Sequence, residues 1–164
     1  MKKITAFGSF LGLAVVLLWY ANRDGESARV KRVVEEARSA VSWDGSETAL
    51  QQIAAAGRLA GCLSKDVEVK VDVLGGLSGG LSGADEVKGA VLAARQHIPR
   101  LEVQFLDLTV SFTDPTHAKV ELTANATTDK PKEINPQEFV LLLHKNEGHW
   151  YIDRVETIRT LQSQ

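Results

Sequence analysis

Residues 101–158 read LEVQFLDLTVSFTDPTHAKVELTANATTDKPKEINPQEFVLLLHKNEGHWYIDRVETI. Apolar and polar residues alternate through much of this stretch, which is the period of a half-buried β-strand. Turn-forming residues interrupt the pattern at Asp114-Pro115, in the polar segment 128–136 and at Asn146-Glu147-Gly148. The stretch therefore predicts four long antiparallel strands, and we expect the rest of the chain to cover or anchor the sheet that they form.

Two irregularities in this stretch refine the prediction. The apolar set changes face between Phe105 and Leu108, which indicates a bulge at Leu106 and Asp107 that would bend the sheet. The run from Phe139 to Leu143 is apolar throughout, as in a central strand, whereas Trp150 to Ile158 is of mixed polarity. We therefore expect the third strand to lie inside the sheet and the fourth to lie on its outside.

The N-terminal segment has the pattern of a membrane helix. Residues 4–21 carry no charge and are mostly apolar, and they follow Lys2 and Lys3. As a helix this run would measure roughly 27 Å, just enough to span the hydrocarbon core of a bilayer. No good small-x-small cleavage site follows it, so we expect residues 1–22 to be a retained transmembrane anchor, with a cleaved signal peptide as the alternative.

The anchor also suggests a location and a packing face. The basic residues before it favour a cytoplasmic N-terminus, so we expect a single-pass protein of the inner or plasma membrane. Its globular domain would then lie on the periplasmic or extracytoplasmic side. Gly8 and Gly12 form a small-xxx-small pair, which would let another membrane helix approach closely.

Residues 23–161 are expected to form one domain, followed by a polar tail at 162–164. Apolar spacing predicts a helix from Ser27 to Trp43 and a second from Glu47 to Leu63, capped by Ser46. We expect the second helix to face the core with Leu50, Ile53, Gly57, Ala60 and Leu63.

A strand, a loop and a third helix complete the first half of the domain. Val67 to Leu74 alternates as a strand, and the glycine-rich residues 75–83 predict a flexible loop. The loop lacks the Gly-Lys-Ser/Thr of a nucleotide-binding loop, so only anion binding at the next helix remains as its functional alternative. Ser82 and Asp85 resemble a capping box for that helix, which Pro99 ends.

Composition excludes several classes of function. The net charge of -2 provides no basic face for nucleic acid. The single cysteine, Cys62, rules out an internal disulfide framework and is expected to be buried in a helix. No cluster of metal ligands accompanies it, and we expect no metal and no cofactor.

Three stretches carry a resemblance to a known family. They are Val67-Glu68-Val69-Lys70-Val71-Asp72, Gly83-Ala84-Asp85-Glu86-Val87 and Gly148-His149-Trp150-Tyr151-Ile152. In this order, with the strands after them, they resemble the nuclear transport factor 2-like superfamily, which includes ketosteroid isomerase-like and polyketide-cyclase-like proteins. The resemblance implies an α+β domain with a cystatin-like fold, in which three helices pack on a strongly curved, mostly antiparallel sheet that forms a cone. Enzymes, ligand binders and assembly subunits share this fold, so the resemblance does not fix the function.

The resemblance also points to candidate site residues. Asp72 matches the position of the isomerase's general base, but the tyrosine and the protonated acid that would stabilise the dienolate have no counterpart here. Asp72 is therefore a weak catalytic candidate. His144, Tyr151 and Asp153 are candidate pocket-lining residues, although the sequence does not fix which face of the sheet they occupy.

Two hypotheses for the function follow. The first is a membrane-anchored, non-catalytic accessory subunit of an integral membrane protein complex, similar in layout to tethered subunits of bacterial secretion systems. Its partners would be that complex or a second copy of the chain, with lipid around the N-terminal helix. The alternative is a protein that binds a small hydrophobic ligand in the cone, or an isomerase- or dehydratase-type enzyme that uses it.

Overall fold

The structure, a computed structural model, describes residues 25–73, 77–129 and 134–160. It is helical from residue 25, where the description begins, to residue 40. The elements that follow are α2 (Ala49–Cys62), β1 (Leu63–Val73), β2 (Leu77–Ser82), α3 (Ala84–His97), β3 (Leu101–Asp114), β4 (His117–Thr128), β5 (Ile134–Asn146) and β6 (His149–Thr160).

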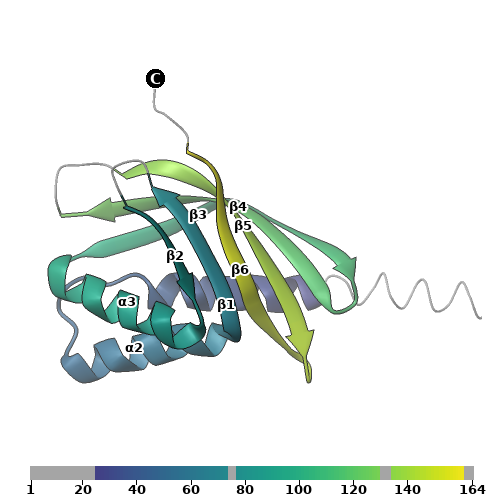
Figure 1. The fold of residues 1–164 in the computed structure, drawn as a ribbon, viewed down its shortest axis with the longest axis horizontal. Coiled ribbons are helices and arrows are strands. Elements are labelled where there is room, and N and C mark those ends of the chain that lie inside the picture. The colour runs from purple at the N-terminus through teal and green to yellow at the C-terminus, as the bar shows by residue number, and fades with distance from the viewer. Residues whose placement is uncertain (1–24, 74–76, 130–133, 161–164) are drawn as a thin grey trace, which may run out of the picture.

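The strands form one six-stranded sheet in the order β2-β1-β6-β5-β4-β3. Only the β1–β6 pairing is parallel, and the other four are antiparallel. The sheet curls around the helix of residues 25–40, while α2 and α3 pack together beside β1 and β2 (Figure 1). The predicted fold class, three helices on a strongly curved and mostly antiparallel sheet, is confirmed.

The four predicted strands are present, but one of them lies at a different position in the sheet from the one that we expected. The bulge is confirmed, because the β3–β4 register shifts between Leu106 and Thr109 and Asp107 has φ 52°. β5 lies inside the sheet, as expected. The expectation of an outer fourth strand is wrong, because β6 lies between β1 and β5. Its mixed polarity arises because one face, with Trp150 and Ile152, is buried and the other is open to solvent.

The helices begin and end differently from the prediction. The first ends at residue 40, and Trp43 instead exchanges backbone hydrogen bonds of 2.7 and 2.9 Å with Leu101 at the start of β3. The cap of α2 is Thr48 rather than Ser46, since Thr48 and Gln51 form a reciprocal capping box. Ser46 instead bonds the Asp44 carboxylate.

The buried face of α2 also differs from the expected one. Leu50 and Ile53 are 77% and 55% exposed, and Gly57 is exposed as well. The buried residues are Ala55, Ala56, Leu59 and Cys62. This face carries mainly small side chains, which permit the close approach of α2 to α3 and β1. Cys62 is buried, as predicted, and burial raises the pKa of its thiol to about 11.

Part of the glycine-rich segment is a strand rather than a loop. Residues 77–82 form β2 and pair with β1, with Val69 opposite Leu81 and Val71 opposite Gly79. An edge strand needs only backbone hydrogen bonds on one side, so its apolar periodicity can be weak. The predicted capping box at Ser82 is not formed. Gly83 is the N-cap of α3, and the Ser82 N–H donates to the Glu86 carboxylate at 2.7 Å.

The predicted anchor, residues 1–22 with Gly8 and Gly12, lies outside the described residues. Within the described ranges, no helix is both long enough and apolar enough to cross a membrane.

A hydrogen-bonded carboxylate joins the first helix to the β5–β6 hairpin. Glu26 accepts a hydrogen bond of 2.8 Å from the indole of Trp150 and lies 3.0 Å from the ammonium of Lys145. Burial by itself would raise the pKa of Glu26, but these two donors outweigh it and the pKa lies below its usual value. The carboxylate therefore stays ionised and holds the helix against the sheet.

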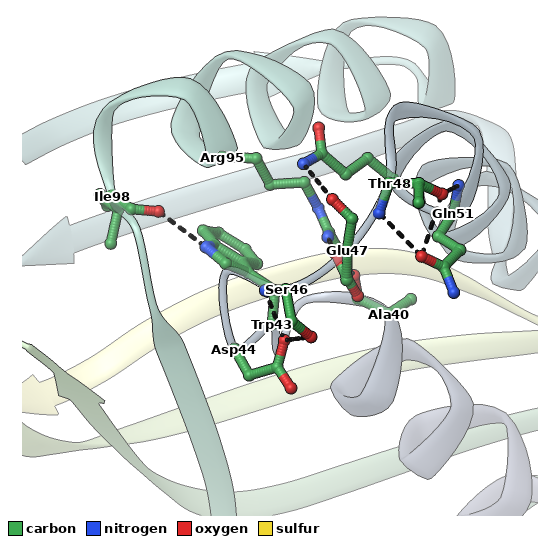
Figure 2. Close-up of polar contacts among 10 residues, drawn as sticks. Ala40, Trp43, Asp44, Ser46, Glu47, Thr48, Gln51, Arg95 and Ile98 are labelled. Atoms are coloured by element: carbon green, nitrogen blue, oxygen red, sulfur yellow. Dashed lines mark hydrogen bonds and ion pairs between the residues drawn. The ribbon is translucent and has the colours of Figure 1, made fainter.

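A buried arginine joins all three helices (Figure 2). The side chain of Arg95, on α3, is 1% exposed and pairs with the carboxylate of Glu47, just before α2. It also donates a hydrogen bond of 2.8 Å to the Ala40 carbonyl, and its guanidinium lies 4.6 Å from the ring centre of Trp43. The Trp43 indole in turn donates to the Ile98 carbonyl at 2.8 Å. We refer to this set as the Arg95 junction.

Gly45 lies beside the Arg95 junction in a position that only glycine fits. Its φ is +83°, and a Cβ built there would lie 2.6 Å from the Pro99 carbonyl oxygen. Gly148 has the same φ, but its Cβ would meet nothing within 4 Å.

We expect Gly148→Ala to lower the free energy of unfolding by about 1 kcal/mol, the cost of a left-handed backbone. Gly45→Ala should cost about 2–4 kcal/mol because the clash adds to it. Urea unfolding of both variants tests this, and equal losses would contradict it.

Candidate ligand-binding site

A cavity lies between the helices and the concave face of the sheet. Its volume is about 240 Å³. Every lining residue except one arginine is apolar: Val34, Ala37, Arg38, Val41, Leu59, Leu63, Val69, Val87, Val91, Val103, Phe105, Leu122, Ala124, Phe139, Leu141, Ile152 and Val155. Alternation along the strands directs these side chains to one face, and the curvature of the sheet leaves space between them. The cone of this domain is therefore hollow.

Burial along the strands shows which end of the cavity is open. On β4, β5 and β6, Leu122, Leu141 and Ile152 are almost fully buried. The next cavity-lining residues on the same strands, Ala124, Phe139 and Val155, are only half-buried. The cavity thus closes where Leu141 lies and opens toward Ala124 and Phe105, which are paired across β4 and β3.

Arg38 is the one charged residue in the cavity wall. Its guanidinium is occupied by Glu35, at 2.6–2.9 Å, and by the Val103 carbonyl, at 2.7 Å. The hydrogen bond to Glu35 raises the pKa of Arg38 and lowers that of Glu35. With its donors engaged in this way, Arg38 contributes mainly its aliphatic stem to the cavity.

The predicted pocket-lining residues come together, but away from this cavity. His144 Nδ1 lies 2.7 Å from Asp153 Oδ1, and the rings of His144 and Tyr151 are 5.8 Å apart. His144 and Tyr151 are paired across β5 and β6, next to the buried pair Leu143 and Ile152. Neighbouring residues in a strand point to opposite faces, so the three polar residues lie on the outer face of the sheet. There they line a separate groove of about 1010 Å³.

The weak catalytic candidate lies at the far end of β1. Asp72 is paired with Ser78 of β2. Its side chain is not among those that the structure describes, so its role as a general base stays a prediction. In the described part of the chain, no group of three or more His, Cys, Asp or Glu residues is arranged to hold a metal ion.

The fold and the cavity together define the class of this protein: an α+β cone of the cystatin-like type with an apolar interior. No protein-family model matches the chain, and no curated protein matches its sequence. Solved structures do match its fold.

Three solved structures illustrate the likeness. A scytalone dehydratase-like protein from Novosphingobium aromaticivorans has 17% identity and a TM-score of 0.67, over 88% of this chain and 92% of that one. The LinA-type3 hexachlorocyclohexane dehydrochlorinase from Novosphingobium barchaimii has 12% identity and a TM-score of 0.64, over 84% and 88%. A protein of unknown function with a cystatin-like fold from Nostoc punctiforme has 10% identity and a TM-score of 0.60, over 80% and 88%. These likenesses show that the chain has a cystatin-like fold, which is the fold that the sequence motifs indicated.

Sequence reasoning did not single out the residues that line the cavity. Alternation places Phe105, Ala124 and Phe139 on strands with a buried face, so their burial was foreseeable. Whether inward side chains meet or leave a space depends on the curvature of the sheet and on the distance to the helices. No sequence pattern reports these two quantities.

Proposed function

We propose that this protein binds a small, uncharged, apolar molecule in the cavity of its cone. The observation that carries the proposal is the cavity itself, an apolar space of about 240 Å³ with one half-buried end. A 150 Å³ apolar cavity holds benzene, so this volume suits a ligand of about ten carbon atoms. The absence of free polar groups in the described wall favours a hydrocarbon or a weakly polar ring system over a charged metabolite.

The comparisons support this proposal more than the accessory-subunit hypothesis. Two of the solved structures with this fold bear the names of a scytalone dehydratase and a dehydrochlorinase, both of which describe enzymes of small molecules. The accessory-subunit hypothesis, with its membrane location and its membrane-protein or second-copy partner, depends on residues 1–22. It stays a prediction. Turnover of the ligand, with Asp72 as the general base, also stays a prediction. We propose binding rather than turnover because an apolar cavity can bind a ligand without a catalytic residue.

Titration with naphthalene and with naphthalene-2-sulfonate tests the proposal. Both probes have the same ten-carbon ring system, and only the second is charged. We expect naphthalene to bind at one site with a dissociation constant on the order of 10–100 μM, from roughly 0.6 kcal/mol per atom. The sulfonate should bind at least about tenfold more weakly because the cavity cannot solvate its charge. Equal affinity for the two probes, or no saturable binding of naphthalene, would overturn the proposal.

A further inference from the structure

The groove on the outer face of the sheet is built from three parts. Its floor is the β5–β6 pair, with His144, Tyr151 and Asp153. One wall is the start of β1, where the register against β6 shifts between Leu63 and Glu68. The other wall is the β3–β4 turn, which contributes Asp114 and His117 among other residues. The cavity of the cone lies on the other face of the sheet, so the two are separate sites.

His144 is oriented by a carboxylate. Its Nδ1 lies 2.7 Å from Asp153 Oδ1, and its side chain is 31% exposed. A carboxylate can only accept a hydrogen bond, so this contact favours the neutral tautomer that carries its proton on Nδ1 and leaves the lone pair on Nε2.

His117 repeats this arrangement on the neighbouring strand. Its Nδ1 lies 2.9 Å and 3.1 Å from the two carboxylate oxygens of Asp114, and 3.1 Å from the Thr116 hydroxyl. The register of β4 and β5 places His117 directly opposite His144. Residues opposite one another share a face of the sheet, with Cβ atoms about 5 Å apart. The two histidines therefore occupy neighbouring positions on the outer face of the sheet, and both line the groove.

We propose that His117 and His144 together bind a divalent transition metal ion through their Nε2 atoms, with Asp114 and Asp153 as the carboxylates that orient them. Imidazole suits Zn²⁺, Ni²⁺ and Cu²⁺, and histidine ligands in metal sites commonly donate their second nitrogen to a carboxylate in this way. No third His, Cys, Asp or Glu of the described chain is placed to join them. The protein thus supplies two ligands, and water completes the coordination shell on the open side of the groove.

Calorimetric titration of the full-length chain with Ni²⁺ and with Zn²⁺ tests the site. We expect one site per chain in the unaltered protein, and at least about tenfold weaker binding in His117→Ala and in His144→Ala. Asp153→Asn should weaken binding about 10–100-fold, as is usual for a residue that orients a ligand. His149→Ala is the matched control. His149 is the first residue of β6, and its Nδ1 lies 3.2 Å from the Glu147 carbonyl oxygen rather than next to a carboxylate.

The outcomes separate this site from general affinity for surface histidines. Unchanged binding in His117→Ala or in His144→Ala would overturn the proposal, and so would an equal loss in His149→Ala. His117 is exposed, so His117→Ala should stay folded. If His144→Ala is unstable, the binding measured with His117→Ala decides whether the proposed site exists. Electron paramagnetic resonance of the Cu²⁺ complex should show two nitrogen ligands, falling to one in either variant. A signal that is the same in the variants would also contradict the site.

Discussion

Replacing Ala124 with tryptophan should abolish the binding of naphthalene while the protein stays folded. Ala124 lines the cavity at its open end, where the added indole would occupy the space that we assign to the ligand. We expect the dissociation constant to rise at least about hundredfold. The free energy of unfolding should change by no more than about 1–3 kcal/mol, which is the usual cost of overpacking, because the indole enters an existing cavity.

Thr123→Trp is the matched control for this prediction. Thr123 precedes Ala124 on β4 and points to the other face of the sheet, so its replacement leaves the cavity unchanged. Naphthalene should bind to Thr123→Trp as it does to the unaltered protein. If Ala124→Trp bound the probe with unchanged affinity, the ligand would occupy another site and the proposed function would be wrong.

Removing the buried guanidinium of Arg95 should cause a large loss of stability. Arg95→Ala leaves the Ala40 carbonyl without its donor, takes the cation from the Glu47 carboxylate and empties the space beside Trp43. Breaking a buried ion pair by removing one partner typically costs 3–5 kcal/mol. Because Glu47 is 25% exposed and can regain some water, we expect about 3 kcal/mol. Urea or thermal unfolding measures the loss.

Two further variants show whether this loss comes from the Arg95 junction. Arg58→Ala removes an exposed arginine of α2 and should change the free energy of unfolding by less than about 0.5 kcal/mol. The double variant Arg95→Met with Glu47→Leu removes both charges and should recover part of the loss, since apolar replacements of a buried pair are often neutral. A loss below about 1 kcal/mol in Arg95→Ala would show that the junction contributes little to stability.

The fold was more predictable from the sequence than the site. The strand alternation, the turns and even the bulge at Asp107 are local signals, so a single sequence contains them. The prediction of the buried face of α2 was wrong because the sequence of this helix offers two apolar stripes. One contains Leu50 and Ile53, and the other contains Ala55, Ala56 and Leu59. The packing of α3 and β1 selects the second stripe, and no local rule weighs a small-residue stripe above a larger apolar one.

The site residues illustrate the same limit. His144, Tyr151 and Asp153 were predicted to line the pocket of the cone, and the structure places them together on the outer face of the sheet. Their face could not be predicted, because an error of one residue in register moves a strand's side chains to the other side of the sheet. The role that we propose for His117 could not be predicted, because its position opposite His144 follows only from the pairing of β4 with β5. The cavity depends on curvature and leaves no sequence pattern of its own.

The parallel pairing of β1 with β6 has a consequence for how the chain folds. It joins Glu68 to Arg154 and Lys70 to Glu156, so the middle of the sheet depends on residues far apart in sequence. Such long-range contacts slow folding because a large loop must close before they form. During synthesis, the edge of β1 that pairs with β6 and the apolar faces of the helices must wait until β6 has been made. Until then they are exposed to other chains, and a chaperone that covers them should raise the yield of folded protein.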